Sequence, residues 1–146
     1  LAYIAVPVVL GTAIGLVTDT GPWYDQLEKS PLNPPSAVFG PVWTVLYVLI
    51  GVAGYLAWSA PGTASLRPAM TLWTAQLLLN LAWSPIFFGA EAPTAALVEI
   101  SVLFVLVVAT IAVFARRSVL AAVLMIPYVW WIAFAGYLNA YIVIHN

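Results

Sequence analysis

The side chains best suited to chemistry in this chain are aromatic rings and amides at helical spacing. Gln76, Asn80 and Trp83 follow one another at steps of four and three residues, so they share one helix face. Two further stripes have this spacing: Tyr128, Trp131, Ala135 and Asn139 in one, and Trp43 and Tyr47 in the other. Such stripes combine flat apolar surfaces with a few hydrogen-bonding groups.

Two interpretations of the stripes stay open at the level of the residues. In the first, the stripes converge on an interior pocket where amides orient a ligand and aromatic faces bind its flat apolar body. In the second, they only pack helices together, because Asn and Gln often bond a neighbouring helix and Trp and Tyr often anchor a span at the membrane interface. The packing interpretation is favoured for any single residue, and the two are about equal for the combined set.

Conventional catalytic sets are absent from the sequence. Cysteine does not occur, and there is no nucleophile with its base, phosphate-binding glycine loop or metal-ligand cluster. Glu99 stands in an apolar segment where a charge is costly, which suggests a proton relay or, as we favour, a structural or cavity-facing carboxyl. His145 could ligate haem iron, although a lone imidazole near a chain end is more often solvated. We therefore predict no catalytic residue, no metal site and no required cofactor.

The elements that must position these groups are predicted to be membrane-spanning helices. Of the 146 residues, 64% are apolar and 6% are charged, whereas soluble domains average about 45–50% and about 25%. A span needs on the order of 20 apolar residues. The uncharged stretches predict one all-α domain over residues 1–146, with five transmembrane helices at about 1–18, 36–60, 68–90, 92–115 and 118–144. We interpret the first stretch as a span and not as a signal peptide.

Charges and prolines add further expectations. The net charge of −1 leaves no basic surface for nucleic acid, so a nucleic-acid partner is excluded. Pro85 and Pro127 lie inside spans, where the missing backbone donor predicts a bend.

The connection from Asp19 to Pro35 is the most unusual segment outside the predicted spans. At about 17 residues it is longer than most connections, and such loops are often lids or binding elements. Lys29 is the only basic residue in the first and third loops, whereas Arg67, Arg116 and Arg117 occupy the second and fourth. This asymmetry predicts a cytoplasmic amino terminus.

Ordered blocks of residues along nearly the whole chain resemble one protein family. The blocks are Trp23-Tyr24 with Leu27 and Lys29, Pro34-Pro35, Phe39–Thr44 with Leu46-Tyr47, Gln76, Leu79-Asn80, Trp83 and Pro85–Gly89, Ala96-Leu97 with Glu99, and Pro127-Tyr128, Trp131, Phe134-Ala135 and Leu138-Asn139. In these blocks the chain resembles the translocator protein family, whose members are also called tryptophan-rich sensory proteins.

The resemblance implies a five-helix transmembrane bundle, a homodimer, and a long first loop that folds over a ligand cavity as a lid. It implies a porphyrin or haem-type tetrapyrrole as the ligand, bound for sensing, sequestration or transport. Carried over by position, the pocket would use Trp43, Asn80, Trp83, Ala135 and Leu138, with Trp23, Tyr24 and Pro34 from the lid. With Tyr47, Tyr128, Trp131 and Asn139 from the stripes, these form the predicted ligand-binding set.

The chain also departs from the family pattern. Lys29 is followed by Ser30 where many members have proline, and Ala37 replaces an aromatic residue, so the lid would contact a ligand differently. The fifth span ends without the Lys or Arg of the animal cholesterol motif, so cholesterol recognition is not carried over. We expect a multi-pass protein of a prokaryotic membrane.

Two other functions compete with tetrapyrrole binding. The first is an enzyme that degrades porphyrin in light with tryptophans as redox partners, as proposed for some family members. The second is a transporter driven by protons through Glu99. We favour a binding protein over an enzyme, because the sequence supplies the tryptophans but no conventional catalytic set.

Overall fold

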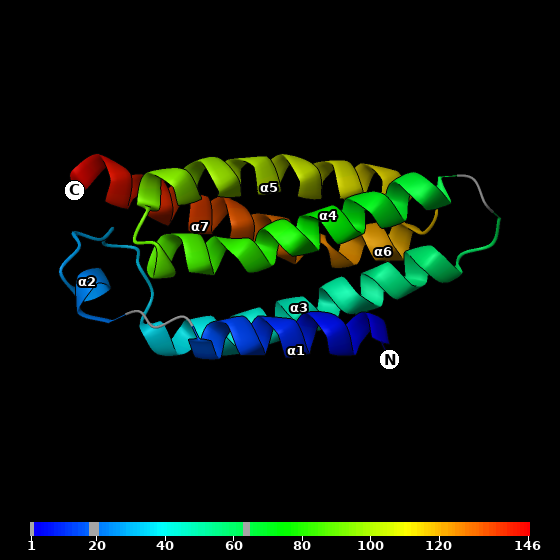
Figure 1. Ribbon diagram of the computed structural model, residues 1–146. Coiled ribbons are helices and arrows are strands. Elements are labelled where there is room, and N and C mark those ends of the chain that lie inside the picture. The colour runs from blue at the N-terminus through cyan, green and yellow to red at the C-terminus, as the bar shows by residue number, and fades with distance from the viewer. Residues whose placement is uncertain (1, 18–20, 63–64) are drawn as a thin grey trace.

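The computed structural model describes residues 2–17, 21–62 and 65–146, and the predicted all-helical fold is confirmed, since the described residues form helices and turns without a strand (Figure 1). The helices are α1 (Ala2–Val17), α2 (Gly21–Asp25), α3 (Ser36–Ser59), α4 (Leu66–Ser84), the π-helix η1 (Pro85–Gly89), α5 (Pro93–Ala115), α6 (Val119–Leu124) and α7 (Ile126–His145). Leu1 and Thr18 of the predicted first span, and Asp19 and Thr20 of the predicted loop, lie outside the described residues.

Three helical stretches are long and apolar enough to cross a membrane: Val38–Ser59, Pro93–Ala115 and Val119–His145. Helix α1 has 16 residues and is shorter than these stretches. Helix α4 is less apolar, since it carries Arg67, Gln76 and Asn80. Length and composition of the described helices therefore support a membrane protein with at least these three spans.

Both predicted proline bends coincide with irregular backbone. The amide of Ala90 bonds the Pro85 carbonyl at 2.8 Å, which is the i→i−5 bond of the π-helical turn that begins at Pro85. The last span is divided at Met125, two residues before Pro127, so α6 and α7 are separate helices. Proline has no amide proton and disfavours helical geometry in the residue before it, which explains why both irregularities occur there.

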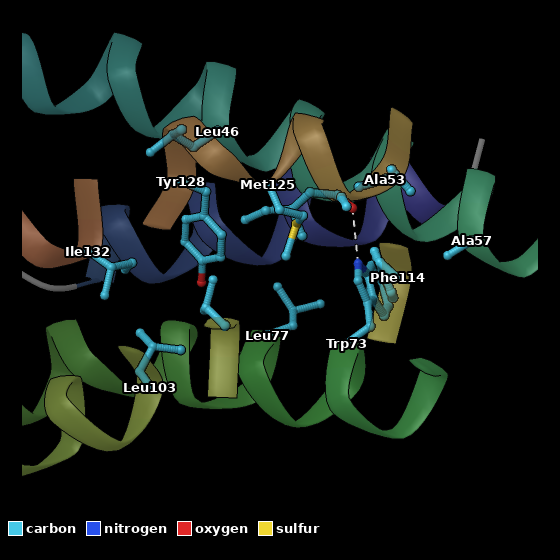
Figure 2. Close-up of a cluster of buried hydrophobic side chains, with 14 of the residues drawn as sticks. Leu46, Ala53, Ala57, Trp73, Leu77, Leu103, Phe114, Met125, Tyr128 and Ile132 are labelled. Carbon is cyan, nitrogen blue, oxygen red and sulfur yellow. Dashed lines mark hydrogen bonds between the residues drawn. The ribbon is translucent and has the colours of Figure 1, made fainter. Parts of the chain in front are cut away.

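The core lies where α3, α4, α5, α6 and α7 meet (Figure 2). Ala53 and Ala57 are fully buried one turn apart on α3, and their small side chains let the neighbouring helices approach. The Trp73 indole donates a hydrogen bond to the Ile50 carbonyl at 3.0 Å, which joins α4 to α3 inside this core. The bundle is thus held by apolar packing with a few buried hydrogen bonds.

Helix α1 packs along α3 through glycines (Figure 1). Gly11 lies against the Tyr47 ring, and Gly51 lies against the backbone of Tyr3 and Ile4, so neither site has space for a Cβ atom. This close approach brings α1 to the edge of the aromatic stripe on α3.

The three arginines lie at one end of the bundle, where α3 and α5 end and α4 begins (Figure 1). Arg117 donates from Nε to the Ala57 carbonyl at 2.6 Å and from Nη2 to the Ala60 carbonyl at 3.0 Å. The guanidinium therefore caps the carboxyl end of α3, where a cation also opposes the negative end of the helix dipole. The loop that carries Lys29 lies at the opposite end.

Candidate functional site

Two adjoining cavities lie near the end of the bundle that carries α2. Cavity A has a volume of about 330 Å³ and is lined by residues of α1, α3, α4, α5 and α7. Cavity B has a volume of about 210 Å³. It lies between α2 with the loop that follows it, α3, α4 with η1, and α7. The two cavities share five wall residues: Phe39, Trp43, Trp83, Ser84 and Ala135. The two cavities therefore adjoin at this shared wall, and we describe them together as one candidate site.

Stacked aromatic rings form much of the wall. Trp43 stacks on Tyr47 with ring centroids 5.5 Å apart, and Trp83 stacks on Phe87 at 5.0 Å. The edge of Trp131 meets Trp43 at 6.4 Å with perpendicular planes. Each ring is thereby fixed by another ring, and aromatic pairs prefer such offset and edge-to-face arrangements. The site therefore presents preformed flat apolar surfaces.

A row of four hydrogen-bonded side chains extends from the wall of cavity A into the core. The Tyr47 hydroxyl bonds Asn80 Oδ1 at 2.6 Å, and Asn80 Nδ2 bonds the Tyr128 hydroxyl at 2.9 Å. The Tyr128 hydroxyl bonds Gln76 Oε1 at 2.8 Å, and Gln76 Nε2 bonds the Trp73 carbonyl at 2.9 Å. We call Tyr47, Asn80, Tyr128 and Gln76 the hydrogen-bonded row. It joins α3, α4 and α7.

A second amide connects the wall of cavity B to α5. The Trp83 indole donates to Asn139 Oδ1 at 3.2 Å, and Asn139 Nδ2 donates to the Pro93 carbonyl at 2.9 Å. Asn139 and Asn80 are both buried, and both also line a cavity. The amides thus make bonds between helices, as in the packing interpretation, and stand on the pocket wall, as in the binding interpretation.

Helix α2 and the loop that follows it cover cavity B. Tyr24 is only 8% exposed, lines the cavity and meets Phe88 edge-on at 5.2 Å. Burial raises the pKa of Tyr24 above its usual value, while a hydrogen bond with Asn33 acts in the opposite direction. The Lys29 ammonium lies 4.6 Å from the centre of the Tyr24 ring. At this distance the ammonium and the face of the ring attract each other electrostatically. This cation–π contact helps to hold Tyr24 in place.

Two contacts attach this segment to α7. The Glu28 amide donates to Asn146 Oδ1 at 3.0 Å, and Asn146 Nδ2 donates to the Glu28 carbonyl at 3.0 Å. The Ser30 and Tyr137 hydroxyls bond each other at 2.8 Å. We call these two contacts the latch. Together they join segments more than 100 residues apart in sequence, because Glu28 and Asn146 are separated by 118 positions.

Most of the predicted ligand-binding residues lie on the cavity walls. Those on cavity A alone are Tyr47 and Asn80, those shared are Trp43, Trp83 and Ala135, and those on cavity B alone are Tyr24, Trp131, Leu138 and Asn139. Trp23 instead packs edge-on against Phe87, and Tyr128 is fully buried behind Asn80. Pro34 does not line either cavity. A ligand-binding role for this set stays a prediction.

The structure adds wall residues that the sequence reasoning missed. Phe39, Ser84, Phe87 and Ile142 line the site, and each lies three or four residues from a predicted member of a stripe. Extending each stripe by one helical turn would have found them. Gly11, Thr12 and Ile14 of α1 also line cavity A. These three were not predicted as pocket residues, because the first span has no stripe of aromatic and amide side chains.

Three buried polar atoms have no hydrogen-bond partner within the described structure. They are both carboxylate oxygens of Glu99 and the indole nitrogen of Trp131. Glu99 itself does not line cavity A or B, although its neighbour Ile100 lines cavity A. His145 is exposed and stacks on Tyr141 with ring centroids 3.8 Å apart. Among the described residues, no group of three or more His, Cys, Asp or Glu side chains could hold a metal ion.

Comparison with known proteins identifies similar sequences over most of the chain. The model of the TspO/MBR family matches residues 3–145. The tryptophan-rich protein TspO of Chlorobaculum tepidum is 42% identical over 80% of this chain and 75% of its own length. The translocator protein of Homo sapiens is 42% identical over 80% of this chain and 70% of its own length. The tryptophan-rich sensory protein of Cereibacter sphaeroides is 37% identical, with 80% and 72% covered.

Proposed function

The chain belongs to the TspO/MBR family, and from this premise we propose that it binds a porphyrin- or haem-type tetrapyrrole in cavities A and B. It is an integral membrane protein, to which both the family and the three long apolar helices point. In this proposal the bound tetrapyrrole is sensed, sequestered or moved. No resident cofactor is required for such a role.

The observation that carries the proposal is the shared aromatic wall between the two cavities. Trp43 and Trp83 each line both cavities, and each is stacked on another ring. Ligand sites are typically concave, mostly apolar and supplied with a few polar groups, with volumes of about 300–1,000 Å³. Because Trp43 and Trp83 line both cavities, a flat aromatic ligand in either cavity would be next to both rings.

The five predicted spans are part of the proposal. Helix α4 and η1 together continue for 24 residues, which at 1.5 Å per residue is about 36 Å and is enough to cross a hydrocarbon core of about 30 Å. The polar side chains of this stretch are accommodated because Gln76 and Asn80 are buried in the hydrogen-bonded row. Helix α1, packed along α3, would be the remaining span.

We also propose that the segment from Gly21 to Pro35 acts as a lid. Tyr24 and Asn33 from this segment form part of the wall of cavity B. The latch holds the segment on α7, which supplies Leu138, Asn139 and Ile142 to the same wall. A ligand in cavity B would therefore be enclosed while the latch is made.

The arginine distribution supports the predicted orientation. Arg67, Arg116 and Arg117 lie at the end of the bundle from which α1 starts, and the lid lies at the other end. By the positive-inside rule the arginine end, with the amino terminus, would face the cytoplasm. A prokaryotic membrane stays a prediction, because relatives of equal identity come from a bacterium and from a mammal.

A homodimer, which the family resemblance implies, is a further part of the proposal. Native mass spectrometry in detergent would give the mass of a dimer if the bundle pairs, and the mass of a single chain if it does not.

Titration of the purified protein with protoporphyrin, followed by tryptophan fluorescence, tests the proposed function. We expect saturable quenching, and we expect the double variant Trp43→Phe, Trp83→Phe to bind at least about tenfold more weakly, since the stacking surface of both rings is reduced. The matched control is Trp58→Phe, because Trp58 is half exposed and does not line cavity A or B.

Two results would contradict the proposal. One is the absence of saturable quenching by the unsubstituted protein. The other is an unchanged affinity of the double variant when thermal unfolding shows that it is folded.

A further inference from the structure

The hydrogen-bonded row behind cavity A has a fixed direction, because its inner end is a backbone carbonyl. The Trp73 carbonyl can only accept, so the Gln76 group 2.9 Å from it must be the amide nitrogen. Gln76 Oε1 then faces Tyr128 and can only accept, which requires that the Tyr128 hydroxyl donates its proton to it. One backbone group thus sets the proton position on a tyrosine in the centre of the core (Figure 2).

The same order continues outward to the cavity. Since the Tyr128 proton is used toward Gln76, the Tyr128 oxygen accepts from Asn80 Nδ2. Asn80 Oδ1 therefore points to Tyr47, and at 2.6 Å from the Tyr47 oxygen it must accept the Tyr47 proton. Tyr47 lines cavity A, and its only hydroxyl proton is already donated. Toward the cavity, the Tyr47 oxygen has lone pairs and no proton.

Two other polar groups on the same wall also donate their protons to protein acceptors and not to the cavity. The Thr44 hydroxyl donates to the Gly40 carbonyl at 2.9 Å, so its oxygen also offers lone pairs. The Trp83 indole proton is used toward Asn139. Thr12 and Ser84 have hydroxyls that can rotate and serve either way, and Trp43 has an indole that can only donate. The fixed acceptors are therefore concentrated on α3, at Thr44 and Tyr47.

We propose that cavity A selects, at Tyr47, ligands that present an N–H or O–H donor on the edge of a flat ring, with Tyr128 and Gln76 as the positioning residues. This inference rests on the proposed function, since it describes how the same cavity chooses among flat ligands. An edge donor gains a hydrogen bond to the Tyr47 oxygen. A ligand that presents a carbonyl there places two acceptors together and loses its own hydrogen bond to water.

Two flat tricyclic probes of the same frame isolate this choice. Carbazole carries an edge N–H, and 9-fluorenone carries an edge carbonyl at the corresponding position. Their dissociation constants would be measured by equilibrium dialysis against the protein in lipid nanodiscs, with empty nanodiscs subtracted. We expect carbazole to bind about tenfold more tightly than 9-fluorenone, which corresponds to one well-placed hydrogen bond.

Gln76→Met is the decisive variant, because it removes the group that fixes the direction without touching the cavity. The Tyr128 proton can then turn to Asn80 Oδ1, the Asn80 amide can reverse, and the Tyr47 proton becomes free to point into the cavity. We expect the preference for carbazole to fall at least about threefold, mainly through tighter binding of 9-fluorenone. Gln26→Met is the matched control, since Gln26 is exposed in the segment from Gly21 to Pro35 and lines neither cavity A nor cavity B.

Tyr47→Phe provides a second variant that keeps the ring stacked on Trp43 and removes the acceptor. It should lower the preference through weaker carbazole binding. The donor of Trp43 is present in every variant, so a change in the ratio between probes reports the row and not Trp43.

An equal affinity for both probes in the unsubstituted protein would overturn the inference, as would a ratio unchanged in folded Gln76→Met and Tyr47→Phe variants. The proposed function fails separately, since it requires binding of protoporphyrin, which is titrated in the same preparation. Probe selection without porphyrin binding would leave the row as a determinant for a different flat ligand.

Discussion

Glu99 is the residue whose environment departs most from what its chemistry favours. Both of its carboxylate oxygens are buried without a partner in the described structure, and α5 is one of the three stretches suited to cross a membrane. A buried polar group without a hydrogen bond destabilises the fold by about 1–3 kcal/mol. No contact in the described structure therefore explains why a carboxyl group occupies this position.

We predict that Glu99→Met raises the midpoint of thermal unfolding, because it removes this desolvated group and keeps a side chain of similar length. A gain on the order of 1 kcal/mol is expected. Glu28→Met is the control, since the Glu28 side chain is exposed and only its backbone makes the latch. A lower midpoint for Glu99→Met would show that the carboxyl has a bonded partner in the membrane.

A substitution at Glu99 also tests the hypothesis that the protein is a transporter driven by protons. If Glu99 carried protons, Glu99→Gln would abolish ligand flux into liposomes that depends on a pH gradient. We expect flux, where it occurs, to be unchanged, because Glu99 does not line cavity A or B.

At the scale of elements, the latch joins the proposed lid to the end of α7. The latch is made of the reciprocal bonds of Asn146 with the Glu28 backbone and of the hydroxyl pair of Ser30 and Tyr137. Each hydrogen bond of this kind contributes little, about 0.5–1.5 kcal/mol. If the segment acts as a lid, it would open by breaking these few bonds and the contact of Tyr24 with Phe88, without unfolding α7.

We predict that Asn146→Ala combined with Tyr137→Phe speeds the release of bound protoporphyrin by about tenfold, because losing the latch lowers the barrier to lid opening by on the order of 1.4 kcal/mol. Stopped-flow recovery of tryptophan emission measures the rate. Ile144→Ala is the control, since Ile144 is 77% exposed. Equal release rates in all three proteins would mean that the segment does not close the site.

The π-helical turn at η1 also acts at this scale. It begins at Pro85 and carries Phe87 and Phe88 to the wall of cavity B. A regular helix would rotate these rings by a different angle, since a π turn holds an extra residue. The proline therefore sets the direction of two rings as well as the bend of the helix.

At the scale of the whole molecule, charge is divided between the two ends of the bundle. Arg67, Arg116 and Arg117 lie at one end, and the lid with Asp25, Glu28 and Lys29 lies at the other. Arg117 is also a structural cap on α3. Its charge thus serves both helix stability and the predicted orientation.

The absence of cysteine from the sequence allows a clean test of this orientation. We predict that Leu32→Cys in the lid reacts with a membrane-impermeant maleimide in intact cells, whereas Pro61→Cys at the arginine end reacts only after permeabilisation. Both positions are exposed, so differences in reactivity report the side of the membrane. The reverse pattern would place the amino terminus outside the cytoplasm.

The sequence by itself determined the helical class, the family and most of the aromatic wall. These follow from local causes: apolar runs without charge favour helices in a membrane, and a spacing of three or four residues places Trp43 with Tyr47 on one face whatever surrounds them. The proline positions indicated the irregular turns for the same reason, since a missing amide proton is a property of the residue itself.

Only the tertiary structure decided which faces meet and in which direction their polar groups point. Gly11 and Thr12 line the wall because of how α1 packs against α3. No aromatic or polar stripe in α1 predicts that packing. Tyr128, predicted as a binding residue, is fully buried behind Asn80. Its proton direction comes from the Trp73 carbonyl through Gln76. Such an order arises only when three helices bring donors and acceptors within about 3 Å of one another.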